Sequence, residues 1–256
     1  MFPRYTYPPF GFLRLVPNIL FGMHRSFRRD GQDCIAQLEP PLRLLGSENV
    51  PAMGGILITF NHYYRPGFNA WWMALGISAI VPTEMHWVMT GELTFPGKWY
   101  APFGEVGSYL LLKRLSQIYG HTTMPPMPPR KKDMEARARA VRKTLAYARQ
   151  HPNAILGLAP EGGDNPPTGE LAKPAPGAGR FIGLLADLGF KIIPVGAYEE
   201  NGEFCLNFGP WYKLNIPHGL KPGEKDDALA ETVMKKIASQ LPERLRGLFN
   251  AIRSTD

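Results

Sequence analysis

Two clusters of polar residues follow short apolar runs, and they carry the residue types that acid–base chemistry uses. Asn61-His62 follows the run 55–60, and Glu161-Gly162-Gly163 follows the run 154–159. A histidine is suited to act as a general base because its unperturbed pKa lies near neutrality. Successive glycines can offer backbone N–H groups to a developing oxyanion. His62 is therefore the candidate catalytic base, although a histidine at a strand end is more often structural than catalytic.

The apolar runs predict the strands that would position these clusters. Continuous apolar stretches bounded by glycine or proline are typical of buried strands, and they occur at 55–60, 86–90, 154–159 and 191–196. The alternating stretch 204–208 predicts an antiparallel edge strand. Helices are predicted at 68–75, 101–119, 133–150, 180–188 and 226–241. This alternation predicts an α/β fold with a mixed, mostly parallel central sheet flanked by helices.

The predicted sheet would bring the two polar clusters together. Ligands of open α/β sheets bind outside the carboxyl ends of the strands. Since His62 and Glu161 each follow a strand, we expect them to face one crevice. The chain contains neither a Gly-x-Ser-x-Gly elbow nor a phosphate-binding P-loop, so the enzyme classes that use these motifs are not indicated.

An ordered set of short blocks resembles the phospholipid/glycerol acyltransferase family, which includes 1-acylglycerol-3-phosphate acyltransferases. The opening of the family is similar to Glu48-Asn49-Val50-Pro51, an apolar strand and then Asn61-His62. Pro160-Glu161-Gly162 matches the family's Pro-Glu-Gly block, and Ile192-Ile193-Pro194-Val195-Gly196 resembles its final block. Leu241-Pro242-Glu243 fits the family's usual ending. The resemblance covers residues 40–242, and the order of the blocks is more specific than any one of them.

The resemblance implies transfer of a fatty acyl group from acyl-CoA or acyl carrier protein to a hydroxyl or amine of a lipid-like acceptor. His62 would deprotonate the acceptor as the general base. Glu161 would help to hold the acceptor, and Gly162, with Gly163 beside it, would bring backbone N–H groups close to the reacting atoms. The reaction implies no metal and no cofactor besides the acyl donor.

The chain departs from the family's His-x4-Asp motif at the residue that orients the histidine. The family places an aspartate five residues after the histidine, and this chain has Gly67 there. Loss of the orienting carboxylate costs about four orders of magnitude in rate in the serine-protease template. Asn69 is the nearby candidate for an orienter, and the more distant candidates are the carboxylates of Glu84, Glu92 and Glu105.

A second departure concerns the residues that would bind a phosphorylated acceptor. The family commonly has Thr-Arg-Ser after its Pro-Glu-Gly block, whereas this chain has Gly163-Asp164-Asn165. A carboxylate disfavours the approach of a phosphate, because like charges repel strongly at low effective dielectric. The candidate phosphate contacts, for acceptor or donor, are Arg65, Arg114 and Arg130, with His121 competing for the family's middle block. A neutral hydroxyl or amine on a lipid, sugar or polyketide is therefore at least as favoured as lysophosphatidate.

The composition fits contact with anionic partners. The formal net charge is +7 and the pI is about 9.4, a balance that suits nucleic acid, anionic membranes or anionic substrates. No zinc-finger spacing, RNA-binding signature or helix-turn-helix pattern is present, so we expect no nucleic-acid partner. Cys34 and Cys205 are far apart and belong to no metal motif, which fits a reducing compartment.

An N-terminal arm, residues 1–39, is expected to precede an acyltransferase-like domain at 40–256. Between residues 2 and 29, aromatic and aliphatic residues are interleaved with arginines, a composition that suits the lipid headgroup boundary. The arm lacks the run of about 18 apolar residues that a spanning helix needs. We expect a cytoplasmic protein that is peripheral on the membrane, and the alternative is an arm that packs on its own domain.

Two functional hypotheses of different classes follow. The first is an active acyltransferase with His62 as base, favoured by the joint presence of His62, Glu161 and Gly162. The second is a non-catalytic lipid- or acyl-binding protein that keeps the acyltransferase fold, favoured by Gly67. A thioesterase or hydrolase with water as the acceptor is a third and weaker hypothesis.

Overall fold

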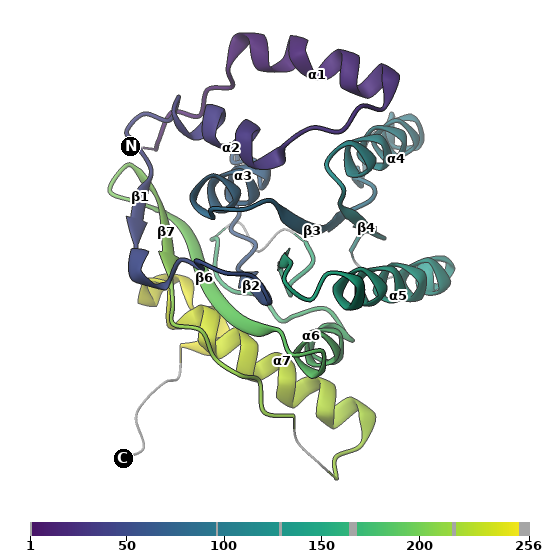
Figure 1. The fold of residues 1–256 in the computed structure, drawn as a ribbon, viewed down its shortest axis with the longest axis vertical. Helices are drawn as coiled ribbons and strands as arrows, with labels where there is room; N and C mark the ends of the chain where they lie inside the picture. Colours follow the sequence, from purple (N-terminus) through teal and green to yellow (C-terminus); the bar gives the residue numbers. More distant parts are fainter. Residues whose placement is uncertain (1, 96, 128–129, 164–167, 217–218, 251–256) are drawn as a thin grey trace.

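The fold is built around a central sheet of seven strands. The computed structural model describes residues 2–95, 97–127, 130–163, 168–216 and 219–250. The strands lie in the order β1-β7-β6-β2-β5-β3-β4 (Figure 1). Their bounds are Arg43–Leu45 (β1), Ile56–Phe60 (β2), Met85–Thr90 (β3), Thr122–Met124 (β4), Ile155–Leu158 (β5), Lys191–Glu200 (β6) and Glu203–Phe208 (β7). Neighbouring strands are parallel except for the antiparallel pair β6–β7. The mixed, mostly parallel sheet predicted from the sequence is confirmed.

The four predicted apolar strands correspond to β2, β3, β5 and β6. All residues of β2 are buried, because a central parallel strand is covered on both faces and reads as a continuous apolar run. β7 is antiparallel to β6, as expected, but it is not an edge strand, since β1 pairs with its other side. That prediction was wrong because β1 has only three residues, too few to show a hydrophobic pattern.

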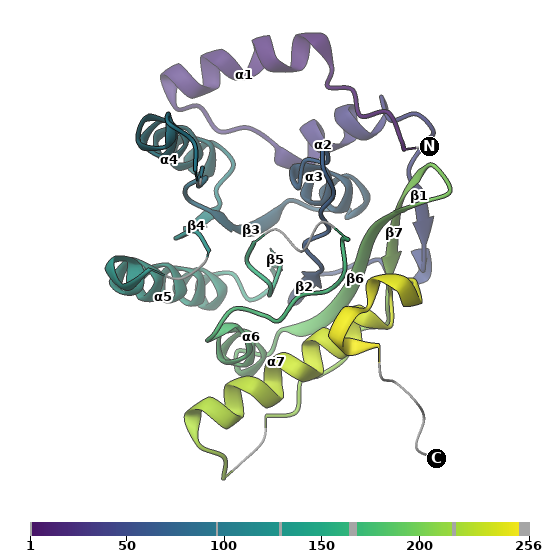
Figure 2. The same cartoon turned by 180° about the vertical axis from the view of Figure 1, so that it is seen from behind.

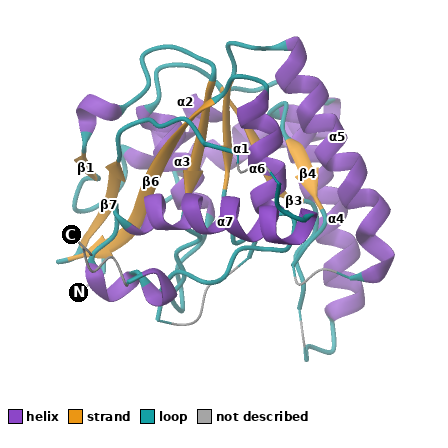
Figure 3. Ribbon diagram, turned by 90° about the horizontal axis from the view of Figure 1, so that it is seen from below, coloured by secondary structure: helices purple, strands orange, loops and turns teal. Residues whose placement is uncertain are grey.

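Helices cover both faces of the sheet. The pair α2 (Phe27–Ile35) and α3 (Trp71–Ile80) lies on one face, and the pair α6 (Ala178–Asp187) and α7 (Pro222–Ala238) lies on the other (Figures 1 and 3). The helices α4 (Ala101–Ile118) and α5 (Met134–Gln150) flank β4 (Figure 2). Short 3-10 helices span Ser47–Asn49, Lys131–Asp133, Glu243–Leu245 and Gly247–Phe249.

The second helix of the N-terminal arm packs closely on the rest of the chain. A Cβ atom added at Gly31 of α2 would lie 2.5 Å from the carbonyl oxygen of Leu75 in α3. Only glycine allows the two helices to approach to this distance. Phe27 and Cys34 of α2 are also buried in the core. The division of the chain at residue 39 stays a prediction.

The first helix of the arm, α1 (Pro9–Phe21), lies on the outside of the molecule beside α4 (Figures 1 and 2). Arg114 of α4 donates hydrogen bonds to the carbonyl oxygens of Ile19, at 2.6 Å, and Leu20, at 3.0 Å. These carbonyls belong to the last turn of α1, where a helix has unsatisfied acceptors. In the described part of the chain, no helix has both the length and the apolar character needed to cross a membrane.

The ring of Trp87 packs tightly between the central strands. A Cβ atom added at Gly157 of β5 would lie 2.5 Å from the ring of Trp87 on β3. Phe60, the last residue of β2, meets the same ring edge-on at a centroid distance of 5.5 Å. The strands β2 and β5, whose carboxyl ends carry the candidate site, therefore belong to a tightly packed part of the core.

Candidate active site

The carboxyl ends of β2 and β5 lie side by side at one edge of the sheet. The two strands are parallel neighbours, and Thr59 of β2 is opposite Leu158 of β5. Asn61-His62 and Pro160-Glu161 therefore leave the sheet at the same edge. The structure brings His62 and Glu161 together, as the sequence predicted.

The carboxylate of Glu161 holds the backbone of His62. The His62 N–H group donates to Glu161 Oε1 at 2.6 Å, and the Ala172 N–H group donates to Glu161 Oε2 at 2.8 Å. Glu161 is only 5% exposed, and a buried carboxylate that accepts backbone N–H groups forms strong, short hydrogen bonds. Glu161 is thus a positioning residue for His62, and a second role in holding the acceptor stays a prediction.

Asn61 fixes the same stretch of backbone from the other side. Its side-chain amide donates to the Ala197 carbonyl oxygen at 2.8 Å and accepts from the Ala197 N–H group at 2.7 Å. Asn61 is completely buried, so this reciprocal pair extends the contact between β2 and β6 by one residue beyond Phe60. Hydrogen bonds to β6 and to the loop after β5 therefore hold the backbone at Asn61 and His62.

Arg65, a candidate phosphate contact, is engaged by a buried glutamate. Its Nε and Nη2 groups both donate to the carboxylate of Glu199, the latter at 2.7 Å, and its Nη1 group donates to the Pro66 carbonyl oxygen at 3.0 Å. The hydroxyls of Tyr5 and Tyr63 also donate to Glu199, at 2.8 and 3.2 Å. This network anchors the loop that follows His62 to β6 and to the N-terminal segment.

The tyrosines of this network stay protonated over the physiological pH range. Burial, reinforced by the negative charge of Glu199, raises the pKa of Tyr63 to about 12 and raises the pKa of Tyr5 still further. Both hydroxyls therefore act as hydrogen-bond donors to the carboxylate.

Asn69, the nearby candidate for an orienter, has other partners among the described residues. Its amide nitrogen lies 3.4 Å from the Tyr7 hydroxyl, and its Oδ1 atom accepts from the Trp71 N–H group at 3.0 Å at the start of α3. Gly67, at the motif's aspartate position, is exposed and has a φ angle of +81°. This left-handed conformation favours glycine over any residue with a side chain.

Two of the more distant carboxylates are also engaged away from the site. Glu84 binds the Ser26 hydroxyl and the Arg28 backbone N–H group. Glu92 forms a two-pronged ion pair with Arg130, at 2.9 and 3.3 Å. Arg130 also pairs with Asp133, and Arg114 caps α1. All three arginines proposed as phosphate contacts therefore have protein partners.

The glycines after Glu161 form a turn against the loop that follows β4. Gly162 has a φ angle of +72°, and its N–H group donates to the Ala159 carbonyl oxygen at 3.2 Å. A Cβ atom added at Gly162 would lie 3.0 Å from Met127, and one at Gly163 would lie 3.3 Å from it. The turn occupies the N–H group of Gly162, and a role of Gly163 as an oxyanion donor stays a prediction. Asp164 and Asn165 lie outside the described residues.

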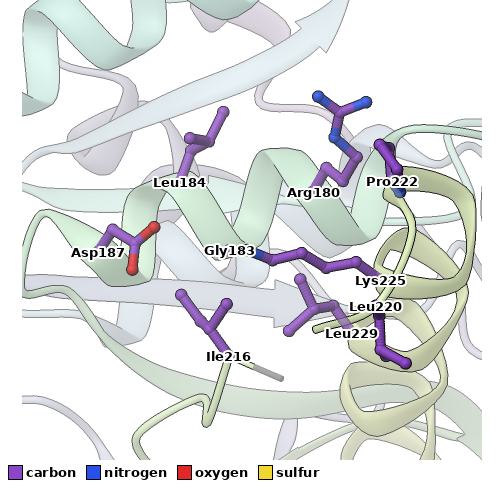
Figure 4. Close-up of a pocket in the computed structure, with 9 residues that line it drawn as sticks. All are labelled: Arg180, Gly183, Leu184, Asp187, Ile216, Leu220, Pro222, Lys225 and Leu229. Carbon is purple, nitrogen blue, oxygen red and sulfur yellow. The ribbon is translucent and has the colours of Figure 1, made fainter. Parts of the chain in front are cut away.

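The described residues line a groove at the ends of β3 and β4 and a smaller cavity between α6 and α7. The groove of about 520 Å³ adjoins Gly91, Arg130 and the ends of β3 and β4. The smaller cavity of about 220 Å³ lies between α6 and α7, and Figure 4 shows that its lining combines apolar side chains with the charged side chains of Arg180, Asp187 and Lys225. None of the site residues expected from the sequence lines the smaller cavity. In the described ranges, no group of three His, Cys, Asp or Glu side chains is placed to hold a metal ion.

The sequence does not predict the structural roles of Asn61 and Glu199. Glu199 follows seven uncharged residues of β6, 192–198, and a charged residue in a buried strand indicates a buried partner. That signal was present, but the partner, Arg65, is 134 residues away in the chain. The contact could be identified only from the fold.

The fold is shared with a known acyltransferase. A solved structure of the 1-acyl-sn-glycerophosphate (LPA) acyltransferase PlsC from Thermotoga maritima matches over 90% of this chain and 92% of that chain, with a TM-score of 0.52 and 14% sequence identity. No protein-family model and no curated protein matches the chain. The chain thus has an acyltransferase-like fold.

Proposed function

We propose that this protein is an acyltransferase that moves a fatty acyl group from acyl-CoA or acyl carrier protein to a hydroxyl or amine of a lipid-like acceptor. The observation that carries the proposal is the hydrogen bond from the His62 N–H group to Glu161. This bond holds a histidine at the carboxyl edge of the sheet, in a fold that is also found in an acyltransferase.

In this proposal His62 acts as the general base. Its imidazole takes the proton of the acceptor hydroxyl, and the oxygen attacks the thioester carbonyl. The tetrahedral intermediate then collapses, the carbon–sulfur bond breaks, and the thiolate takes the proton back from the imidazolium. The Gly163 N–H group is the candidate donor to the oxyanion, because the Gly162 N–H group is used within its turn.

Hydrogen bonds anchor the backbone from which the imidazole of His62 extends. Asn61 and Glu161 fix the backbone on both sides of His62, and Glu199 anchors the following loop through Arg65. A catalytic group held on rigid elements keeps its geometry better than one on a free loop. We propose that this anchoring contributes to the placement of His62 at the carboxyl edge of the sheet.

A non-catalytic lipid- or acyl-binding protein is the second candidate function. It is favoured by Gly67, because the positive φ angle at this position favours glycine over an aspartate. The engagement of Arg65, Arg114 and Arg130 by protein groups also fits a site without a phosphorylated acceptor.

We also propose peripheral contact with an anionic membrane, through a surface formed by α1 and α4. Leu13, Val16 and Leu20 form an exposed apolar stripe on α1, and Phe103, Val106 and Leu110 form a stripe of the same spacing on α4. Exposed apolar patches of this kind mark interaction sites. We call these six side chains the interfacial surface.

The surroundings of the interfacial surface fit the headgroup region of a bilayer. Trp99, which is 87% exposed, stands just before α4, and tryptophan is enriched at membrane–water interfaces. Arg14, Lys98 and Lys113 are exposed basic residues of the same segments, and each lysine or arginine near an anionic surface contributes about 1 kcal/mol.

Product analysis tests the proposed function against its rival. Purified protein is incubated with isotope-labelled oleoyl-CoA and a total lipid extract, and acylated products are identified by mass spectrometry. A transferase yields a labelled ester or amide together with free CoA. Labelled fatty acid alone would indicate a thioesterase, and lipid that copurifies without any product would indicate a binding protein.

A further inference from the structure

The groove beside β3 and β4 has the size and lining of a small-molecule site. Its volume of about 520 Å³ lies within the range of about 300–1,000 Å³ that is typical of ligand pockets. Apolar side chains supply part of the lining, namely Met124, Pro125 and Pro126 from the end of β4, and Ala136 and Ala140 from α5.

The charged part of the lining is predominantly basic. Arg130, Arg139, Arg142 and Lys143 line the groove, against Glu92 and Asp133. Arg130 is neutralised by its ion pairs with the two carboxylates. Arg139 pairs with Glu135 in an exposed i,i+4 contact, of a kind that contributes little. No ion pair with another described residue engages Arg142 or Lys143.

The groove and the candidate active site share one edge of the sheet. The neighbouring strands β2, β5, β3 and β4 are parallel, so their carboxyl ends point the same way. At a strand spacing of about 4.8 Å, β4 lies roughly 10 Å from β5 and roughly 15 Å from β2. The groove is therefore separated from His62 by the width of only a few strands.

One loop connects the two places directly. Pro125 and Pro126 line the groove, and Met127, the next residue, lies against Gly162 and Gly163 of the candidate active site. Arg137 of α5 donates to the carbonyl oxygens of Pro125 and Pro126, at 3.3 and 3.0 Å, and so fixes the loop.

We propose that this groove binds the phosphate-bearing nucleotide end of acyl-CoA, while the pantetheine arm runs along the sheet edge and presents the thioester to His62. The inference rests on the proposed function and specifies its donor. Guanidinium and ammonium groups bind phosphate through charge-assisted hydrogen bonds, and the apolar lining suits an adenine ring. Arg139, Arg142 and Lys143 are the phosphate-binding residues, and Arg130 holds the wall of the groove in place.

Calorimetric titration of the full chain with CoA tests this assignment without any turnover. The double variant Arg142→Gln/Lys143→Gln should raise the Kd for CoA about tenfold or more, since each lost charge-assisted bond corresponds to about one order of magnitude. Binding of pantetheine, which lacks the phosphates, should not change. Lys143→Arg should keep wild-type affinity for CoA, and Arg149→Gln, on an exposed position of α5 outside the groove, should do the same.

Three results would overturn the assignment. The first is equal affinity of the double variant and the wild type for CoA, and the second is an equal loss of affinity in Arg149→Gln, which would show a diffuse charge effect. The third is that the double variant loses affinity for glycerol 3-phosphate but not for CoA, because the groove would then bind an acceptor phosphate. Weakened CoA binding in a protein that proves unable to transfer acyl groups would support the groove and reject the proposed function.

Discussion

The backbone of His62 is held from both sides by buried polar side chains. Asn61 bonds to the backbone of β6, and Glu161 accepts the His62 N–H group from the loop after β5. Small displacements of a catalytic group are costly, since an error of about 1 Å can reduce the rate about a hundredfold. In the proposed mechanism, Asn61 and Glu161 would therefore act as positioning residues for His62, and neither has to touch a substrate.

Replacing Glu161 by glutamine should lower kcat. The two carboxylate oxygens accept from two backbone N–H groups, and an amide can accept from only one of them in the same geometry. We expect kcat to fall by at least about tenfold, with the KM for the acyl donor unchanged. The free energy of unfolding should fall by about 1–3 kcal/mol, because one buried N–H group loses its acceptor.

Steady-state kinetics and urea unfolding measure both effects. Glu231→Gln, an exposed glutamate of α7, is the matched control and should change neither. A Glu161→Gln variant that raises the KM for the acceptor at constant kcat would show instead that this carboxylate holds the acceptor.

At the scale of secondary-structure elements, α1 and α4 differ from the other helices in the number of large hydrophobic side chains that they expose. More than half of the exposed large hydrophobic side chains of the described residues lie on these helices or directly before α4. The inner face of α4 contacts the rest of the protein through buried side chains such as Leu112, and α1 contacts α4 through Arg114. The uncovered stripes are suited to the boundary of a bilayer.

The double variant Phe103→Glu/Leu110→Glu should weaken binding to vesicles of phosphatidylcholine and phosphatidylserine. Burial of one such side chain contributes about 1.5–3 kcal/mol, so we expect the vesicle-bound fraction to require at least about ten times more lipid. Cosedimentation measures the effect. Leu248→Glu is the control, because Leu248 is as exposed as Phe103, at 79% against 78%, but lies outside the interfacial surface. Unchanged binding of the double variant would remove α4 from the proposed surface.

The elements with long, regular patterns could be predicted from the sequence, and the short ones could not. β2, β5 and β6 carry continuous apolar runs, and α5 shows helical periodicity, so their existence was evident before the fold was known. β1 and β4 have three residues each and depend on pairing with distant segments. The α1 helix contains Pro17, which disfavours a helix interior, and its structure was not assigned.

At the scale of the whole molecule, the meeting of His62 and Glu161 could be predicted, because strand ends of a parallel sheet share one edge. The partners of the candidate residues could not be predicted. Arg65 was expected to bind phosphate, and its buried contact with Glu199 joins segments 134 residues apart. Asn69 is predicted to lie near the imidazole, and its contact with the Tyr7 hydroxyl joins segments 62 residues apart, whereas its bond to the Trp71 N–H group is local.

Stability of the whole fold should fall as the pH drops below about 6.5. Burial lowers the pKa of His86 to about 4 and that of His121 to about 3, whereas both histidines titrate near 6.5 in the unfolded chain. The unfolded state then binds more protons than the folded state between these values, so acid favours unfolding. At pH 5 each histidine should cost about 2 kcal/mol relative to pH 7.

Urea unfolding at pH 7 and pH 5 measures this loss. The variant His121→Phe keeps an aromatic ring beside Phe27 and removes one titrating group. It should lose about 2 kcal/mol less than the wild type over the same pH interval. An identical loss in the two proteins would show that His121 does not remain neutral because of burial.

The most direct test of the proposed chemistry is the rate of acyl transfer by His62→Ala. A positioned general base contributes about two to four orders of magnitude, so kcat should fall by at least about a hundredfold, with the binding of acyl-CoA retained. His24→Ala, which removes an exposed histidine from the α1–α2 connection, should transfer acyl groups at the wild-type rate. Equal rates for His62→Ala and the wild type would contradict the assignment of His62 as the catalytic base.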